Sequence, residues 1–143
     1  MKKVILFFIL ALILSGCTSQ DEDIFSEDVT SEINYIFEGS NENWGISYKV
    51  DVINKKKGEN QVDEYGTAKF IGEGQTPEMI DYKLATETDI NSSEGVGIPI
   101  YDRIGDFAQG SCGNCVPMQG DEELELEIIW NGKSEKILLT TNE

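Results

Sequence analysis

The stretch ELELEIIWNGKSEKILLT, residues 123–140, decides the fold. From Leu124 to Trp130 every second residue is large and apolar, the period of two that a strand with one buried face requires. Asn131-Gly132 follows, and these residue types tolerate the positive φ angles of a type I′ hairpin turn. The stretch therefore predicts two antiparallel strands joined by a two-residue turn.

A two-residue turn also sets the register of the hairpin, because it fixes which residues face each other. Two apolar pairs are expected on the buried face and one pair of opposite charges on the exposed face: Leu124–Leu139, Leu126–Ile137 and Glu127–Lys136. Pattern, turn and cross-strand pairs agree, which strengthens the prediction.

Two stretches upstream alternate in the same way. Large residues occupy every second position from Trp44 to Val52, and again from Ile80 to Leu84. Residues 62–71 predict a poorer strand, in which Gly66 marks a β-bulge. Each of these stretches is followed by a turn-like sequence.

The segment between these strands and the hairpin is less regular. Residues 88–97 are expected to form a loop, and Ile98 and Ile100 a short strand that Pro99 confines to a sheet edge. Residues 102–109 predict at most a single helical turn. About six or seven short strands without a long helical period favour an all-β domain over residues 33–143. We expect an antiparallel immunoglobulin-like β-sandwich, with a small β-barrel as the alternative.

The amino terminus has the features of an export signal. Lys2 and Lys3 precede an unbroken apolar run from Val4 to Leu14, which is too short for a bilayer span of about 20 residues. The run ends in Leu14-Ser15-Gly16-Cys17, which closely resembles the lipobox of bacterial lipoproteins. This resemblance implies cleavage by signal peptidase II before Cys17.

The resemblance further implies diacylglycerol on the Cys17 thiol and attachment to the extracytoplasmic face of the cell membrane. Residues 1–16 are then the signal peptide, and 17–32 are the lipidated cysteine with an acidic tether that is expected to be disordered. A calcium-binding acidic run is the alternative for this tether. A second resemblance rests on Phe37-Glu38-Gly39-Ser40-Asn41-Glu42-Asn43-Trp44, which is similar to a segment before the first strand of small uncharacterised lipoproteins of Bacillus-type Firmicutes. It implies a surface β-domain and no activity.

Composition excludes several function classes. The chain has 11 basic and 27 acidic residues and a net charge of −16, so nucleic acid is not an expected partner. It has no histidine, which excludes Ser-His-Asp and Cys-His nucleophiles and histidine-ligated metals. We therefore expect no enzyme activity and no cofactor. The expected partners are the membrane, through Cys17, and an envelope protein or ligand that the sequence does not identify.

Cys112-Gly113-Asn114-Cys115 is the only compact reactive motif. Outside the cytoplasm a structural disulfide is the expected state of such a pair. Thiol–disulfide exchange or metal handling is the alternative, with Asp106 or Asp121 as a possible further metal ligand. A calcium loop at residues 89–95 is disfavoured, because its glycine falls one place late for an EF-hand and residue 100 is not a glutamate. The sequence thus favours a non-catalytic binding module at the cell envelope.

Overall fold

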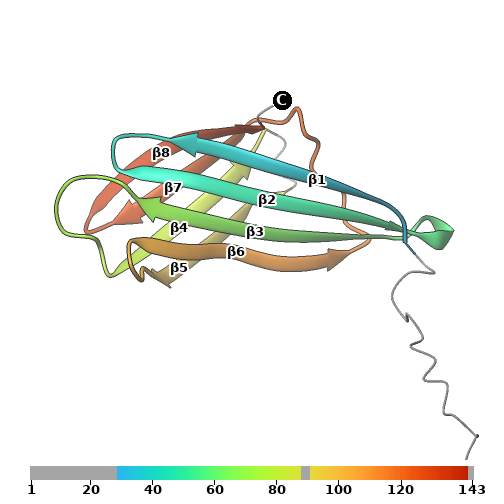
Figure 1. Ribbon diagram of the computed structural model, residues 1–143, viewed down its shortest axis with the longest axis horizontal. Helices are drawn as coiled ribbons and strands as arrows, with labels where there is room; N and C mark the ends of the chain where they lie inside the picture. The colour runs from blue at the N-terminus through green and yellow to red at the C-terminus, as the bar shows by residue number, and fades with distance from the viewer. Residues whose placement is uncertain (1–28, 88–90, 142–143) are drawn as a thin grey trace, which may run out of the picture.

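The computed structural model describes residues 29–87 and 91–141 (Figure 1). Eight β-strands make up most of this part of the chain, and a short 3-10 turn (η2), Lys56–Gly58, joins the second strand to the third. The strands are β1 (Val29–Ser40), β2 (Trp44–Lys55), β3 (Asn60–Phe70), β4 (Met79–Thr86), β5 (Ser93–Pro99), β6 (Ile104–Gly113), β7 (Leu124–Trp130) and β8 (Lys133–Thr141).

The predicted hairpin is confirmed as β7 and β8. Leu124 pairs with Leu139 and Leu126 with Ile137. The turn residues Asn131 and Gly132 have φ angles of 48° and 73°. Both positive values are what a type I′ turn requires.

One detail of this hairpin differs from the prediction. Glu127 and Lys136 are paired in register, yet the Lys136 Nζ contacts Glu125 Oε1 at 2.6 Å. Glu127 accepts a hydrogen bond from Ser134 instead. Glu125 lies diagonally across from Lys136 on the same face of the sheet, and a long lysine side chain can reach such a diagonal neighbour.

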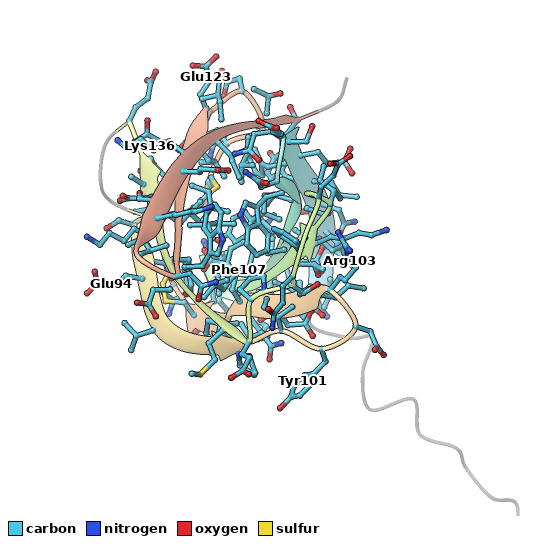
Figure 2. The ribbon with its side chains drawn as sticks, turned by 90° about the vertical axis from the view of Figure 1, so that its left-hand side faces the viewer. Glu94, Tyr101, Arg103, Phe107, Glu123 and Lys136 are labelled. Atoms are coloured by element: carbon cyan, nitrogen blue, oxygen red, sulfur yellow. A yellow bond between two sulfur atoms is a disulfide. The ribbon has the colours of Figure 1, made fainter. Side chains whose placement is uncertain are left out.

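All strands belong to one antiparallel sheet with the order β5-β4-β7-β8-β1-β2-β3-β6. The two end strands, β5 and β6, approach each other, so the sheet curls nearly into a barrel around one core (Figure 2). The predicted all-β antiparallel fold is confirmed, and the near closure of a single sheet matches its small-barrel form. Among the described residues, no helix has the length and apolar character needed to cross a membrane.

The core explains why the alternating stretches form strands. Every second residue of β2 from Trp44 to Val52 is at most 5% exposed, as the alternation predicted. Phe107 of β6 lies inside the barrel between two tyrosine rings, with its centroid 6.3 Å from that of Tyr48 and 4.9 Å from that of Tyr82 (Figure 2). Trp44 and Trp130 are both buried in this core, where the sequence placed them.

The amino-terminal boundary of the domain lies earlier than predicted. β1 begins at Val29, inside the segment assigned to the acidic tether. Residues 29–32 extend as a strand because they pair with the far end of β2, up to Val29 opposite Lys55. The remainder of the predicted tether and the signal peptide, 1–28, lies outside the described residues.

The motif at residues 37–44 spans the end of β1, the turn 41–43 and the first residue of β2, so it follows the start of the first strand. The Asn41 Oδ1 accepts hydrogen bonds from the backbone N–H groups of Asn43 (3.0 Å) and Trp44 (2.8 Å). The Glu135 carboxylate of β8 accepts bonds from the side-chain amides of Asn41 (2.8 Å) and Asn43 (2.6 Å). These bonds attach the turn to the β7–β8 hairpin.

Two further predictions on the second half of the chain are wrong. Residues 93–99 form β5, although 88–97 was expected to be a loop, and residues 104–113 form β6, although only a helical turn was expected. Both strands are rich in glycine and poor in alternation, and they form because a neighbouring strand, β4 or β3, supplies their hydrogen bonds. β5 is an edge strand, as Pro99 predicted. A register irregularity lies between Glu64 and Gly66, next to the predicted bulge, but the extra residue is on β6, where Ala108 has a φ of 48°.

Candidate functional site

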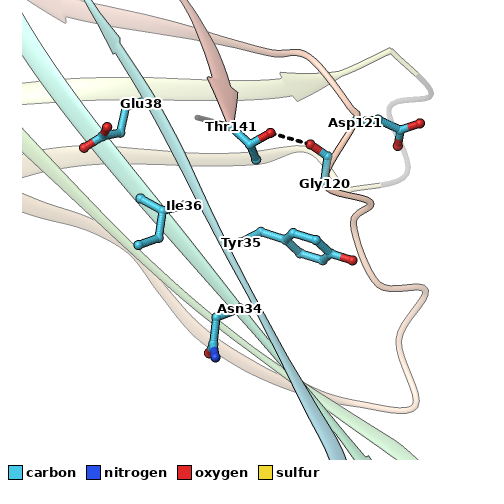
Figure 3. Close-up of a pocket in the computed structure, with 7 residues that line it drawn as sticks. All are labelled: Asn34, Tyr35, Ile36, Glu38, Gly120, Asp121 and Thr141. Atoms are coloured by element: carbon cyan, nitrogen blue, oxygen red, sulfur yellow. Dashed lines mark hydrogen bonds between the residues drawn. The ribbon is translucent and has the colours of Figure 1, made fainter. Parts of the chain in front are cut away.

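A hollow of about 820 Å³ lies between β1, the loop 114–123 and the end of β8. β1 supplies one wall, and Gly120, Asp121 and Thr141 supply the other. Figure 3 shows Ile36 and Glu38 on one side of β1 and the Tyr35 ring on the other, directed toward Gly120. The hollow therefore runs beside β1 where its pairing with β8 ends, and residues that are far apart in sequence lie on its two sides.

Close contacts hold the two walls of this hollow together. A Cβ atom on Gly120 would lie only 2.6 Å from Tyr35 Cε1, so the ring packs directly on the glycine backbone. The Thr141 Oγ1 donates a hydrogen bond of 2.7 Å to the Gly120 carbonyl (Figure 3). Two residues before Gly120, the Met118 side chain is 1% exposed and covers one end of the core. The loop is thus packed in place, and the shape of the hollow is built into the fold.

The edge of β1 at this hollow is open. β8 pairs with β1 only at Phe37 and Glu38, whereas β2 pairs with it along its whole length. On the β8 side of residues 29–36, no other strand of the described chain is paired. Strand residues direct their N–H and C=O groups alternately to the two sides, so some backbone groups of this segment face the hollow without a strand partner.

The two cysteines of the C-x-x-C motif are a close pair at the end of β6. Their sulfur atoms lie in contact and their Cα atoms are 5.9 Å apart, a separation usual for disulfides. Three hydrogen bonds attach the turn between them to the start of β3: Asn114 N to Asn60 O (2.8 Å), Asn60 N to Asn114 Oδ1 (3.2 Å) and Asn60 Nδ2 to Cys115 O (2.9 Å). The pair therefore fixes the point at which the loop 114–123 leaves the barrel.

The setting of the pair bears on its chemistry. Cys112 is exposed at the end of a strand, and no helix N-terminus of the described segments lies beside it to favour the thiolate. Within residues 29–87 and 91–141, no three histidine, cysteine, aspartate or glutamate side chains gather in a way that could hold a metal ion. Cys17, the acidic run at 21–23 and part of the 89–95 loop lie outside the described residues.

A carboxylate inside the barrel was not anticipated. Glu64 lies opposite Val50, so its side chain is directed to the inner side of the sheet, and burial raises its pKa above the usual carboxyl range. The Tyr48 hydroxyl is fully buried and lacks a well-directed hydrogen bond. Burial and, second, the nearby charge of Glu64 raise the pKa of Tyr48. The alternation of Val62, Glu64 and Gly66 with exposed residues was the signal in the sequence that places Glu64 inside.

Glu64→Gln is expected to stabilise the protein at neutral pH. Because the folded-state pKa of Glu64 is raised, ionisation of Glu64 costs stability as the pH rises through that value. Glutamine removes this cost, and the gain should be at most about 1 kcal/mol because the carboxylate is only half-buried and partly screened. Urea unfolding at pH 7 and pH 4 should show the gain at pH 7 only.

Glu123→Gln is the matched control for this pH experiment, because Glu123 is exposed and its removal changes the net charge equally. An equal gain for both variants at pH 7 would assign the effect to net charge and contradict a specific role of burial at Glu64.

The residues that line the hollow were missed by the sequence analysis, apart from Asp121, which had been considered only as a metal ligand. Tyr35 and Phe37 alternate within the predicted β-domain, 33–143, but no separate strand was predicted for this segment. Nothing local to Gly120 or Thr141 indicates that they meet β1. Comparison of the chain with protein-family models, with curated proteins and with solved structures finds no match.

Proposed function

We propose that this protein is a non-catalytic binding module, held at the extracytoplasmic face of the cell membrane by lipid on Cys17. The observation that supports binding is the hollow of about 820 Å³ beside the open edge of β1. Its lining combines apolar contact area, from Tyr35 and Ile36, with polar groups that can orient a ligand, from Glu38 and Asp121. A loop beside an unpaired strand edge on a rigid barrel is suited to presenting such a surface.

The membrane attachment in this proposal is supported by residues 1–17. Each acyl CH₂ that enters the bilayer contributes about 0.8 kcal/mol, so two chains on one cysteine are enough for stable anchoring. With the signal peptide removed, nine basic and 27 acidic side chains remain. An acidic domain is repelled by an anionic surface, so the lipid, and not the domain surface, is proposed as the membrane contact.

Cys17→Ala tests the attachment. The wild-type protein is expected to incorporate radioactive palmitate and to sediment with membranes, and the variant to lose all of the label because the acceptor thiol is gone. Cys112→Ala is the matched control and should keep the label. A wild-type mature protein that is soluble and unlabelled would contradict lipid anchoring.

Photo-crosslinking tests the hollow as the binding surface. A benzophenone side chain at position 36, introduced into the full-length protein in its native membrane, should give one dominant adduct. The same side chain at position 104 is the control, because Ile104 is similarly exposed (42% against 49%) but lies on β6. Equal adducts at both positions, or none at either, would contradict a binding role for the hollow.

We further propose that Cys112 and Cys115 form a structural disulfide. A bridge that closes a loop of four residues reduces the entropy of the unfolded chain only modestly, so the double variant Cys112→Ser, Cys115→Ser should lose about 2 kcal/mol of unfolding free energy. Binding at the hollow should change little. Thiol titration of the purified, unreduced protein checks the pairing, and two reactive thiols at these positions would contradict it.

A further inference from the structure

The open edge of β1 has the properties of a strand acceptor. Val29–Ile36 is eight residues long, is paired with β2 on one side, and has no backbone hydrogen bond from another described segment on the other. Such an edge can add a further strand through its main-chain groups. Three of its apolar side chains are partly exposed, Val29 (42%), Ile33 (43%) and Ile36 (49%), so an added strand would also gain apolar contacts.

This edge carries little of the usual protection against strand addition. Exposed edges are commonly blocked by lysine, proline, a bulge or an inward-pointing charge. From Thr30 to Ile36 there is no lysine, proline or glycine, and Glu32 is the only charged residue. The one register irregularity lies at the extreme end, between Val29 and Ser31. The strand therefore remains regular and extended beside the hollow.

Charge selects among the possible occupants of the edge. Of the described residues that line the hollow, the charged ones, Glu38 and Asp121, are both acidic, and none is basic. Lys49, opposite Ile36 on β2, is paired with Asp51 at 2.7 Å. A second mature copy of this chain would bring nine basic and 27 acidic side chains to an acidic surface, and the chain's own segment 18–28 contains five acidic and no basic residues. Both are disfavoured by like-charge repulsion.

We infer that Val29–Ile36 receives an extended, lysine- or arginine-rich segment of a partner protein, which joins the sheet as an additional strand along the hollow. This inference rests on the proposed binding function and specifies its partner. Main-chain hydrogen bonds to β1 require the partner segment to be extended, and the acidic residues of the hollow favour a segment with positive charge.

A peptide of eight residues in which lysine alternates with valine is the probe. It should bind the full-length lipidated protein in detergent, and its affinity should fall about tenfold or more between 50 and 500 mM NaCl because the charges are exposed. Hydrogen exchange should slow at amides within residues 29–36. A peptide with glutamate in place of lysine should not bind, and equal binding of the two peptides would overturn the inference.

Backbone methylation of the peptide separates strand addition from simple charge attraction. N-methyl groups on alternate residues remove either the donors that face β1 or those that face away. One methylated peptide should bind about tenfold or more weakly, and the other should stay within about threefold of the parent, because only one set of N–H groups bonds to the edge. Equal affinity of the two methylated peptides would overturn the inference.

Ile36→Lys is the matching change in the protein, since it places a cation on the edge at an exposed position. It should weaken peptide binding at least about tenfold by repulsion and by loss of apolar contact, whereas Ile104→Lys on β6 should change it less than about twofold. Equal effects of the two variants would overturn the inference.

Other occupants of the β1 edge can be distinguished by hydrogen exchange at residues 29–36. Protection of residues 29–36 that depends on protein concentration without peptide would assign the edge to a second copy. Protection that disappears on deletion of residues 18–28 would assign it to the chain's own segment. Either result overturns the inference and leaves the photo-crosslinking test intact. A crosslink at position 36 without peptide binding would support the binding module and contradict strand addition.

Discussion

Trp44→Ala is expected to lower the free energy of unfolding by about 3–5 kcal/mol. The Trp44 side chain is fully buried, with its ring centroid 5.2 Å from that of Phe70 and 5.3 Å from that of Trp130. Both ring pairs have the edge-to-face geometry that aromatic side chains prefer. Alanine removes both contacts and leaves a cavity between β2, β3 and β7 that the surrounding strands cannot fill.

The loss is large relative to the whole stability of a domain, which is about 5–15 kcal/mol. The melting temperature should fall by roughly 12–20 °C for a domain of this size. Guanidinium unfolding monitored by circular dichroism measures the change. Tyr101→Ala, at a side chain that is 75% exposed, should stay within about 0.5 kcal/mol of the parent. A Trp44 variant as stable as the Tyr101 variant would contradict this account of the core.

Gly39→Ala is expected to cost about 2–3 kcal/mol and to act at the junction between β1 and β8. A Cβ atom at this position would collide with the Leu138 carbonyl oxygen and lie 2.8 Å from Leu139 Cδ2. A backbone atom cannot move away as a flexible side chain can, so β8 must shift. The junction has only two register pairs, at Phe37 and Glu38, and it also closes one end of the hollow.

The expected signature is therefore both a lower unfolding midpoint and faster hydrogen exchange at Thr140 and Thr141. Gly110→Ala is the matched control, because Gly110 also lies in a strand but a Cβ atom there has no neighbour within 4 Å. That variant should be within about 0.5 kcal/mol of the parent or slightly more stable, since alanine restricts the unfolded chain. Equal losses for the two variants would contradict a specific role of the close approach at Gly39.

The strands that could be predicted are those whose information is local. The β7–β8 hairpin has alternation, a turn pair and complementary cross-strand residues within 18 consecutive positions, and its register is confirmed residue by residue. β2 has five buried residues at every second position. In both cases the side-chain period of a strand coincides with burial on one face, which is the property that a sequence displays directly.

The strands that were missed depend on their neighbours. β5 and β6 contain many glycines and weak alternation, and they are extended because β4 and β3 already present unpaired backbone groups. β1 begins in an acidic segment, where composition indicated a tether, and its first residues are held by pairing with β2. Such pairing is a tertiary property, and composition does not reveal it.

The same distinction applies to the candidate sites. The sequence by itself determined the all-β class, the hairpin register, the proximity of Cys112 to Cys115 and the absence of histidine chemistry, because each depends on residue type or on positions close together in the chain. Only the tertiary structure decided that Tyr35 meets Gly120 beside an open strand edge. Gly120 is 85 positions from Tyr35, and no local pattern records a contact that arises when a sheet of eight strands curls almost into a barrel.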